Sequence, residues 1–224
     1  MRLILFDCDG TLVDSQNIIV STMHAAFAMH GIAAPSRDAV LAIVGLSLEQ
    51  AIATLLGDQA DRAAEVAVSY REQFQSRRQD GVLEPLYPGA REVVTALASR
   101  DDTLLGIVTG KSRRGVDAVL GGHGLLDCFV TIQTADDAPS KPHPAMVLQA
   151  LSATGADAAH TVVIGDTTYD MMMARSAGTG AVGVSWGYHA PQTLPEAGAE
   201  IVLTRFDDLP PWLERRWAAS EIAA

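Results

Sequence analysis

The sequence predicts an α/β protein with a doubly wound parallel sheet and an inserted domain that is entirely helical. From residue 83 onward, apolar runs without polar alternation, which are typical of strands covered on both faces, alternate with helical patterns. Between residues 15 and 82 the chain shows helical patterns and no convincing strand. We therefore expect a core domain formed by residues 1–14 and 83–224 and a helical cap domain formed by residues 15–82.

Each apolar run marks a strand of the predicted core sheet. The first strand is formed by the four residues from Leu3 to Phe6. Five more strands are expected at residues 104–108, 129–133, 161–164, 181–184 and 201–203. Helices are expected between them at residues 90–99, 114–120, 145–151 and 171–177. Alternation of this kind is typical of a parallel sheet with helices on both faces.

Polar residues mark the starts of the helices in the inserted segment. Ser15 and Ser36 are expected to cap the first two helices, and Ser47 begins a capping box that opens the third. The four helices are expected to end near residues 30, 44, 57 and 78. A movable cap needs hinges, which we expect at residues 14–17 and 81–84. An ordinary helical crossover, lengthened by insertion, is the alternative that spacing leaves open.

Composition and charge limit the class of protein. With 224 residues, of which 48% are apolar, the chain can bury a full core. Its formal net charge of −11 argues against binding to nucleic acid or to an anionic membrane surface. Cys8 and Cys128 form no zinc or redox spacing, as expected for a reduced, intracellular protein. Without a membrane-spanning run or a signal peptide, we expect a soluble, cytoplasmic protein and assume a monomer.

Carboxylates follow two of the apolar runs. Asp7 and Asp9 come directly after the first strand, and Asp166 and Asp170 follow the run at residues 161–164. The carboxyl ends of parallel strands meet at one edge of a sheet, so these four side chains are expected to lie close together. Gathered carboxylates repel one another unless a cation separates them, and their oxygens suit a hard divalent ion. We predict that they bind Mg²⁺.

Residues that suit phosphate stand at the same edge. Thr109, at the end of the second apolar run, offers a hydroxyl, and Lys141, in a loop next to a proline, supplies positive charge. Lys111 could add to that charge, although a solvated helix start is an equal alternative for it. Gly10 permits a sharp exit from the first strand. The predicted phosphate-binding residues are Gly10, Thr11, Gly110 and Lys111.

The stretch Asp7-Cys8-Asp9-Gly10-Thr11 resembles the DxDGT signature of the haloacid dehalogenase superfamily, in its phosphatase branch. Further along, Thr109, Lys141 and the stretch from Gly165 to Asp170 look like the second, third and fourth motifs of that superfamily. The resemblance therefore covers essentially the whole chain. It implies a Rossmann-like core, and the helical insert after the first motif is most similar to that of the phosphoglycolate phosphatases of subfamily IA.

The resemblance implies a role for each matched residue. Asp7 would attack phosphorus to give an aspartyl phosphate, and Asp9 would protonate the leaving alkoxide and later activate water. Thr109 would hold the phosphoryl group, and Lys141 would balance charge and orient Asp7. The implied ligands of Mg²⁺ are the Asp7 side chain, the Asp9 backbone carbonyl and Asp166, with Asp170 in support.

The resemblance also ranks the possible functions. Dehalogenases lack an acid/base at the position of Asp9, so a Mg²⁺-dependent phosphatase acting on a small phosphorylated metabolite is implied, with phosphoglycolate as the leading ester. Two alternatives stay open. One is a sugar phosphomutase, although mutases typically carry an aliphatic residue where Thr11 stands, and the other is a non-catalytic protein that binds a phosphate ligand. Substrate choice is expected to depend on cap residues near Gly45 and Leu46.

Overall fold

The core of the protein is a parallel sheet, seen in a computed structural model that describes residues 1–79 and 83–223. Within these residues the sheet has six strands in the order β3-β2-β1-β4-β5-β6, and all neighbours are parallel. The strands are β1 (Arg2–Phe6), β2 (Thr103–Thr109), β3 (Thr131–Thr134), β4 (Thr161–Gly165), β5 (Gly180–Val184) and β6 (Ile201–Leu203). The order reverses at β1 and β4, so the predicted doubly wound sheet is confirmed.

Strand β1 is apolar throughout because both of its faces are covered. Ile4 and Phe6 belong to the apolar cluster on one face of the sheet, whereas Leu3 and Leu5 belong to the cluster on the other. All four side chains are completely buried. Successive residues of a strand point to opposite faces, so a central strand between two helical layers needs apolar residues at every position.

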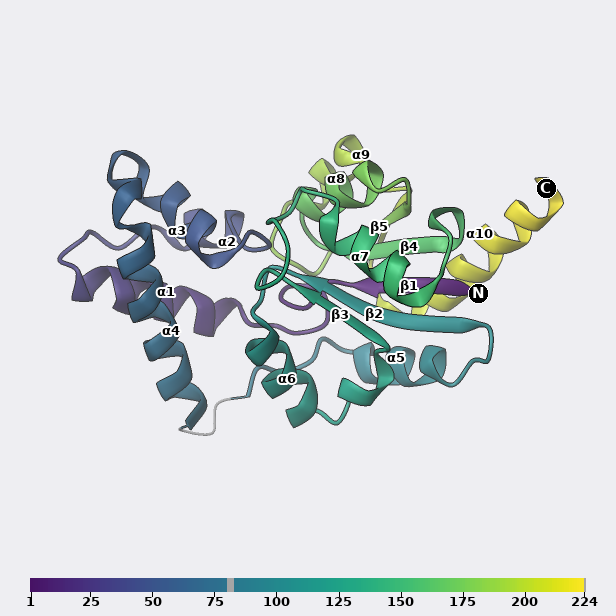
Figure 1. Ribbon diagram of the computed structural model, residues 1–224, viewed down its shortest axis with the longest axis horizontal. Coiled ribbons are helices and arrows are strands. Elements are labelled where there is room, and N and C mark those ends of the chain that lie inside the picture. Colours follow the sequence, from purple (N-terminus) through teal and green to yellow (C-terminus); the bar gives the residue numbers. More distant parts are fainter. Residues whose placement is uncertain (80–82, 224) are drawn as a thin grey trace.

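Two helical layers cover the sheet (Figure 1). One face carries α5 (Ala90–Ala98), α6 (Arg113–Gly122) and α10 (Leu209–Ala223). The other face carries α7 (Ala145–Thr154), α8 (Thr168–Ser176) and the short α9 (Leu194–Ala197). In the part of the chain that the structure describes, none of the helices combines the length and the apolar character needed to cross a membrane.

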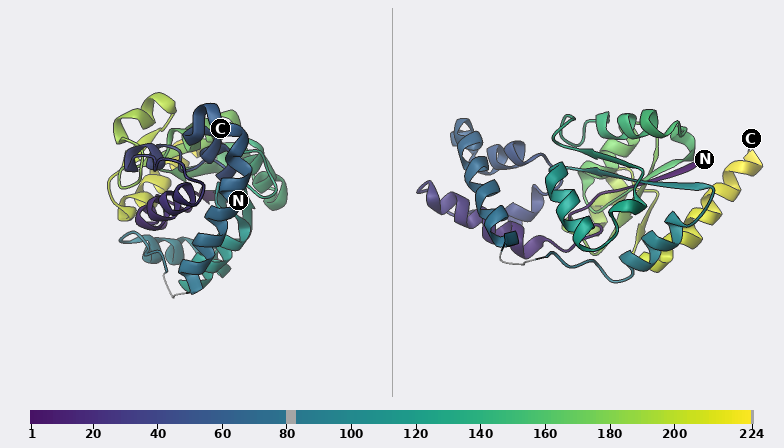
Figure 2. Two further views of the ribbon diagram at one scale, coloured as in Figure 1. Left: turned by 90° about the vertical axis from the view of Figure 1, so that its left-hand side faces the viewer. Right: turned by 60° about the horizontal axis from the view of Figure 1, so that its bottom comes forward.

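The inserted segment forms a helical unit beyond the carboxyl ends of the strands (Figures 1 and 2). It contains α1 (Gln16–Met29), α2 (Arg37–Ala42), α3 (Leu48–Leu56) and α4 (Ala63–Gln79), with a 3-10 helix over Gly57–Arg62 between α3 and α4. These helices pack around an apolar cluster of their own, which includes Met23, Phe27, Ile52 and Val66. Its status as an independent cap domain stays a prediction.

The chain leaves the core and returns to it at adjacent points. The N–H of Asp14 donates to the carbonyl of Pro85 at 2.8 Å, and Val13 and Leu86 form an antiparallel bridge beside it. The two crossings therefore form a short hydrogen-bonded ribbon, on which the first predicted hinge begins. The second predicted hinge, at residues 81–84, and the domain boundary within it fall partly outside the described residues.

Ser15, Ser36 and Ser47 all stand at the N-cap positions of their helices, but only Ser36 makes the predicted side-chain capping bond. Ser36 caps α2 as predicted, but Ser15 makes no capping bond because its hydroxyl donates to Asp9 at 2.7 Å. The capping box predicted at Ser47 is not formed at the start of α3. A capping box needs the N–H of its first residue, and here that N–H donates to Ser140 Oγ at 2.7 Å.

Helix α8 begins at Thr168 rather than at the predicted residue 171. The reason is a capping box upstream of the predicted start. The N–H of Thr167 donates to Asp170 Oδ2 at 3.0 Å, and the N–H of Asp170 donates to Thr167 Oγ1 at 3.3 Å. This box fixes Asp170 in the first turn of the helix. The other predicted elements are present, with ends shifted by a few residues.

Candidate active site

Three buried carboxylates meet at the carboxyl edge of the sheet. Asp7 follows β1 and Asp166 follows β4, the neighbouring strands at which the strand order reverses, and Asp170 lies at the start of α8. One carboxylate oxygen of each lies within 4.8 Å of the others. Ligands of doubly wound sheets bind at this point of the fold. Negative charges this close require a cation or a shared proton.

The two carboxylate oxygens of Asp7 have different surroundings. Oδ1 accepts a hydrogen bond from the N–H of Cys8 at 2.7 Å and lies 2.9 Å from the ammonium of Lys141. Oδ2 is buried and has no hydrogen-bond partner among the described residues. Burial raises the pKa of Asp7 to about 6, although Lys141 works against it, and Asp170 adds to the rise. A buried, unpartnered anionic oxygen fits a metal ligand or a nucleophile.

Asp166 is held in place by three segments of the chain. Its Oδ1 accepts from the hydroxyl of Thr11 at 2.9 Å, and its Oδ2 accepts from the N–H of Tyr188 at 2.8 Å. Gly10, with a φ of +86°, and Gly187 pass so close that a Cβ on either would overlap this side chain. Burial and the neighbouring carboxylates raise the pKa of Asp166 well above its usual value. Gly10 and Thr11, predicted to bind phosphate, therefore both contact Asp166.

Lys141 balances the charge of the carboxylate cluster. Its fully buried ammonium lies 2.6 Å from Asp170 Oδ1 and 2.9 Å from Asp7 Oδ1. Burial alone would lower the pKa of Lys141, but the two carboxylates outweigh it and hold that pKa above its usual range. The other oxygen of Asp170 accepts from the hydroxyl of Thr167 at 2.6 Å. Both oxygens of Asp170 are therefore engaged, as are both oxygens of Asp166, whereas Asp7 Oδ2 has no hydrogen-bond partner among the described residues.

The carboxylate of Asp9 lies outside this cluster. Lys111 Nζ is 2.8 and 3.1 Å from its two oxygens, and the hydroxyl of Ser15 donates to it at 2.7 Å. Glu84 Oε1 lies 3.4 Å from the same ammonium. Burial would lower the pKa of Lys111, but the neighbouring acidic groups, Asp9 and Glu84 among them, together outweigh burial and raise that pKa. Of the four carboxylates predicted to gather, the structure brings three together and pairs the fourth with a lysine predicted to bind phosphate.

Thr109 and Gly110 complete the floor of the site. Thr109 is buried at the end of β2, and its hydroxyl accepts from the N–H of Lys111 at 3.2 Å. Gly110 lies directly against the helical unit, since a Cβ there would come within 2.5 Å of the carbonyl oxygen of Leu46 and 2.6 Å of that of Gly45. Only glycine leaves room for this backbone approach. Gly45 and Leu46 therefore lie against the floor of the site.

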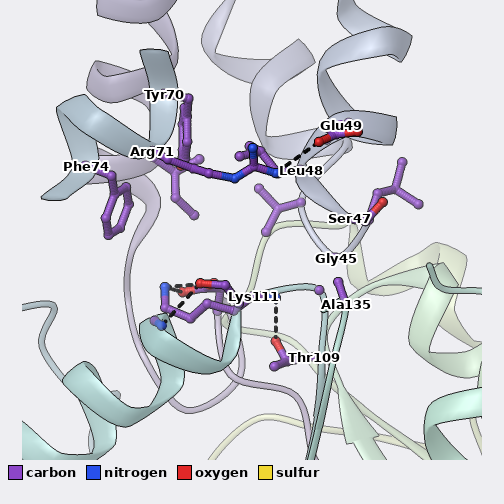
Figure 3. A pocket seen from close by; sticks show the side chains of 18 of the residues that line it. Gly45, Ser47, Leu48, Glu49, Tyr70, Arg71, Phe74, Thr109, Lys111 and Ala135 are labelled. Carbon is purple, nitrogen blue, oxygen red and sulfur yellow. Dashed lines mark hydrogen bonds and ion pairs between the residues drawn. The ribbon is translucent and has the colours of Figure 1, made fainter. Parts of the chain in front are cut away.

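A cavity of about 760 Å³ lies between the helical unit and the core. Its floor includes Asp7, Asp9, Thr109 and Lys111, and its roof is formed by α4 and the start of α3. Figure 3 shows Tyr70, Arg71 and Phe74 of α4 above Lys111. Asp7 of the carboxylate cluster and the helical unit thus face each other across this cavity.

A family model described as haloacid dehalogenase-like hydrolase matches residues 4–184 of the chain. The match spans most of the sequence and includes all of the cluster described above. The chain belongs to the haloacid dehalogenase-like hydrolase family.

Relatives in this family resemble the chain along nearly its whole length. A probable phosphatase, IndB, of Dickeya dadantii is 35% identical, with 92% of this chain and 91% of that protein covered. A pyrophosphatase, PpaX, of Bacillus velezensis is 32% identical (92% and 93% covered), and a phosphoglycolate phosphatase of Photorhabdus laumondii is 27% identical (93% and 91%). A solved hydrolase from Pseudomonas syringae superposes with a TM-score of 0.83, 25% identity and coverage of 96% and 99%. The predicted resemblance to phosphatases of this family, and the predicted class of enzyme, are confirmed.

In this haloacid dehalogenase-like hydrolase, polar contacts join the helical unit to the loops of the core. The N–H of Ser47 donates to Ser140 Oγ at 2.7 Å. The carbonyl of Ala42, at the end of α2, accepts from the Tyr169 hydroxyl at 3.3 Å and contacts His189 Nε2 at 3.1 Å. These contacts connect the helical unit to the core beside the cavity.

Three residues of the haloacid dehalogenase-like site are missing from the predicted set. Tyr188 follows β5, so the same rule that singled out residues after β1 and β4 could have found it. Ser140 directly precedes Lys141, and its contact with Ser47 depends on how the helical unit sits on the core. Glu84 has no local signal, because its only mark in the sequence is its place between the two parts of the chain.

Proposed function

We propose that the protein is a Mg²⁺-dependent phosphatase that hydrolyses a small phosphomonoester, with Asp7 as nucleophile and Asp9 as general acid and base. The observation that supports this most directly is the asymmetry of Asp7. Its Oδ1 is fixed by Cys8 and Lys141, while its buried Oδ2 has no hydrogen-bond partner among the described residues. An oxygen held in this way is available to form a bond to phosphorus.

The donor set of the cluster suits Mg²⁺, since it offers carboxylate oxygens and no softer ligand. Asp7 and Asp166 would hold the ion, with the backbone carbonyl of Asp9 as a further proposed ligand and Asp170 in support. When bound, Mg²⁺ supplies charge neutralisation for the phosphoryl oxygens. Lys141 would keep Asp7 oriented, and Thr109 would hold the phosphoryl group at the floor of the cavity.

Two displacements would complete the reaction. In the first, Asp7 Oδ2 forms a bond to phosphorus, the ester P–O bond breaks, and Asp9 gives its proton to the leaving alkoxide. In the second, water attacks phosphorus and passes a proton to Asp9, and the bond between phosphorus and Asp7 breaks. The sum is one ester and one water converted to one alcohol and one inorganic phosphate, with both aspartates restored.

The helical unit would act as the cap of this site. Its closure over the cavity excludes bulk water while the phosphoryl group transfers, which strengthens the interactions of that group with Lys141 and Thr109. The contacts of Ala42 and Ser47 with the core support this role, because they join the two parts at the rim of the cavity.

Phosphate release from a panel of small phosphomonoesters tests the proposal, with phosphoglycolate included because the resemblance points to it. We expect release that requires Mg²⁺, stops with a chelator and falls at least about a thousandfold in Asp7→Asn. Asp61→Asn, an exposed position in the helical unit, is the matched control. A folded, Mg²⁺-loaded protein that releases no phosphate would refute hydrolysis. Interconversion of sugar phosphates after addition of a sugar bisphosphate would then identify a mutase.

A further inference from the structure

The helical unit presents apolar side chains to the interior of the cavity. The lining from this unit includes Ile19, Met23, Leu46, Leu48, Tyr70 and Phe74, all of them buried or half-buried. Its charged lining residues, Glu49 and Arg71, have side chains that are 57% and 54% exposed. Figure 3 shows Tyr70, Arg71 and Phe74 above Lys111, with the side chain of Arg71 extending across the roof to Glu49. Among the described residues, the charge of the roof is therefore confined to the pair of Arg71 and Glu49, and the other lining side chains of the roof are largely apolar.

Among the described residues that line the cavity, the positive charges have anionic partners or lie at its rim. Lys111 Nζ lies 2.8 Å from Asp9, and Arg71 lies 3.1 Å from Glu49. Arg114 also lines the cavity but is exposed on α6. A second anionic group on the substrate, such as a carboxylate or a second phosphoryl, would have to displace Glu49 from Arg71, reach Arg114 at the rim, or lie against the apolar side chains of the roof. Burial of an unpaired charge is strongly unfavourable.

We infer that the alcohol released from the substrate is uncharged, largely apolar and larger than glycolate, and that it packs against Leu48, Tyr70 and Phe74. This inference rests on the proposed phosphatase function. The volume of about 760 Å³ supports it, because cavities of this size enclose ligands far larger than a phosphoryl group with a two-carbon acid. Contact with the apolar roof would stabilise such an alcohol in proportion to the area that it buries.

Steady-state kinetics with matched esters tests the inference. Benzyl phosphate, methyl phosphate and phosphoglycolate are all esters of primary alcohols, so they differ in the body of the alcohol and not in the bond that breaks. With Mg²⁺ present, we expect kcat/KM for benzyl phosphate to exceed that for methyl phosphate by at least about tenfold. The kcat/KM values for phosphoglycolate and for pyrophosphate should be equal to or lower than the value for methyl phosphate. A higher kcat/KM for either of these than for benzyl phosphate would overturn the inference.

A substitution in the roof tests whether Leu48 contributes to the preference for an apolar alcohol. In Leu48→Asn the ratio of kcat/KM for benzyl over methyl phosphate should fall about tenfold, because the apolar contact is lost. Leu148→Asn is the matched control, since Leu148 is an exposed leucine of α7 that does not line the cavity. Its ratio should equal that of the wild type. If the ratio in Leu48→Asn equals that of the wild type, the proposed contact between Leu48 and the alcohol is wrong.

Thermal protection by phosphonates separates this inference from the proposed function, because phosphonates bind without being hydrolysed as esters. Phenethylphosphonate and phosphonopropionate replace the bridging ester oxygen of benzyl phosphate and phosphoglycolate by a methylene group. With Mg²⁺ present, the first should raise the melting temperature of the wild type more than the second. If no ester is hydrolysed, the proposed function fails, and this comparison still decides the inference. Equal or greater protection by phosphonopropionate overturns it.

Discussion

The backbone N–H of Tyr188 donates a hydrogen bond to Asp166 Oδ2 at 2.8 Å. The side chain of the same residue reaches the other half of the site, since its hydroxyl lies 2.9 Å from Ser15 Oγ and accepts from the N–H of Ser15 at 3.0 Å. Ser15 in turn donates to Asp9. One residue after β5 therefore positions both the proposed metal ligand and, through Ser15, the proposed acid/base.

Tyr188→Phe should separate these two effects. The backbone bond to Asp166 remains, so the affinity for Mg²⁺ should not change, while loss of the hydroxyl frees Ser15 and should lower kcat about threefold to tenfold. Metal titration and steady-state kinetics measure the two quantities. Tyr169→Phe is the comparison variant, because its hydroxyl contacts Ala42 of the helical unit at 3.3 Å and not the acid/base, so it separates loss of a contact with the helical unit from loss of support for Ser15. Weaker Mg²⁺ binding with an unchanged kcat would contradict this assignment.

Gly10→Ala should disrupt the metal site. A Cβ at this position would overlap the carboxylate of Asp166, and its φ of +86° is unfavourable for any side chain. We expect loss of Mg²⁺-induced stabilisation in a thermal melt, together with loss of phosphate release. Gly31→Ala is the matched control, since Gly31 has a φ of +67° with no atom within 4 Å of the added Cβ. It should cost only about 1–2 kcal/mol of backbone strain and keep the response to Mg²⁺.

Asp7→Asn should stabilise the metal-free protein at neutral pH. Burial raises the pKa of Asp7 from 3.8 to about 6, so the folded state binds its proton more tightly than the unfolded state does. Wild-type stability therefore falls as pH rises from about 4 to about 6, by about 3 kcal/mol in total. In thermal melts with chelator, the Asp7→Asn variant should have a higher melting temperature than the wild type above pH 6, and the difference should vanish below about pH 4. A lower melting temperature for the variant at pH 7 would contradict the raised pKa.

Glu84→Gln should strengthen phosphate binding. Glu84 is almost completely buried, with Oε1 3.4 Å from the ammonium of Lys111, so it offsets part of the positive charge at the floor of the cavity. Removing its charge should lower KM for a phosphomonoester about threefold to tenfold and increase inhibition by inorganic phosphate. Glu92→Gln, at an exposed position of α5, should change neither. A higher KM would instead indicate that Glu84 is needed to hold Lys111 in place.

Sequence patterns predict those parts of the structure that depend on neighbouring residues in the chain and on the regular geometry of a parallel sheet. The apolar run from Leu3 to Phe6 predicts a strand covered on both faces, and the convergence of Asp7 and Asp166 follows from parallel strands. The caps at Ser15 and Ser47 fail because long-range hydrogen bonds, to Tyr188 and Asp9 in one case and to Ser140 in the other, replace the local ones.

The pairing of Lys111 with Asp9 shows the same limit for the site. Lys111 follows the end of β2 and lines the cavity, as the convergence of strand ends predicts. Its partner is not predictable from the local pattern, since the two residues lie 102 positions apart and the ion pair depends on side-chain packing from both parts of the chain. Glu84 and the ring of Phe74, 5.2 Å from Lys111 Nζ, complete that packing.

The hydrogen-bonded ribbon at Asp14 and Pro85 brings the two ends of the helical unit together, so the unit is connected to the sheet in the way that a long hairpin loop is. The entropy cost of closing a loop grows only with the logarithm of its length. The stability of the sheet therefore depends only weakly on the length of the inserted segment. Exchange of the whole unit for another would leave the carboxylate cluster intact. The segment proposed to set substrate range is therefore distinct in sequence from the three carboxylates of the cluster.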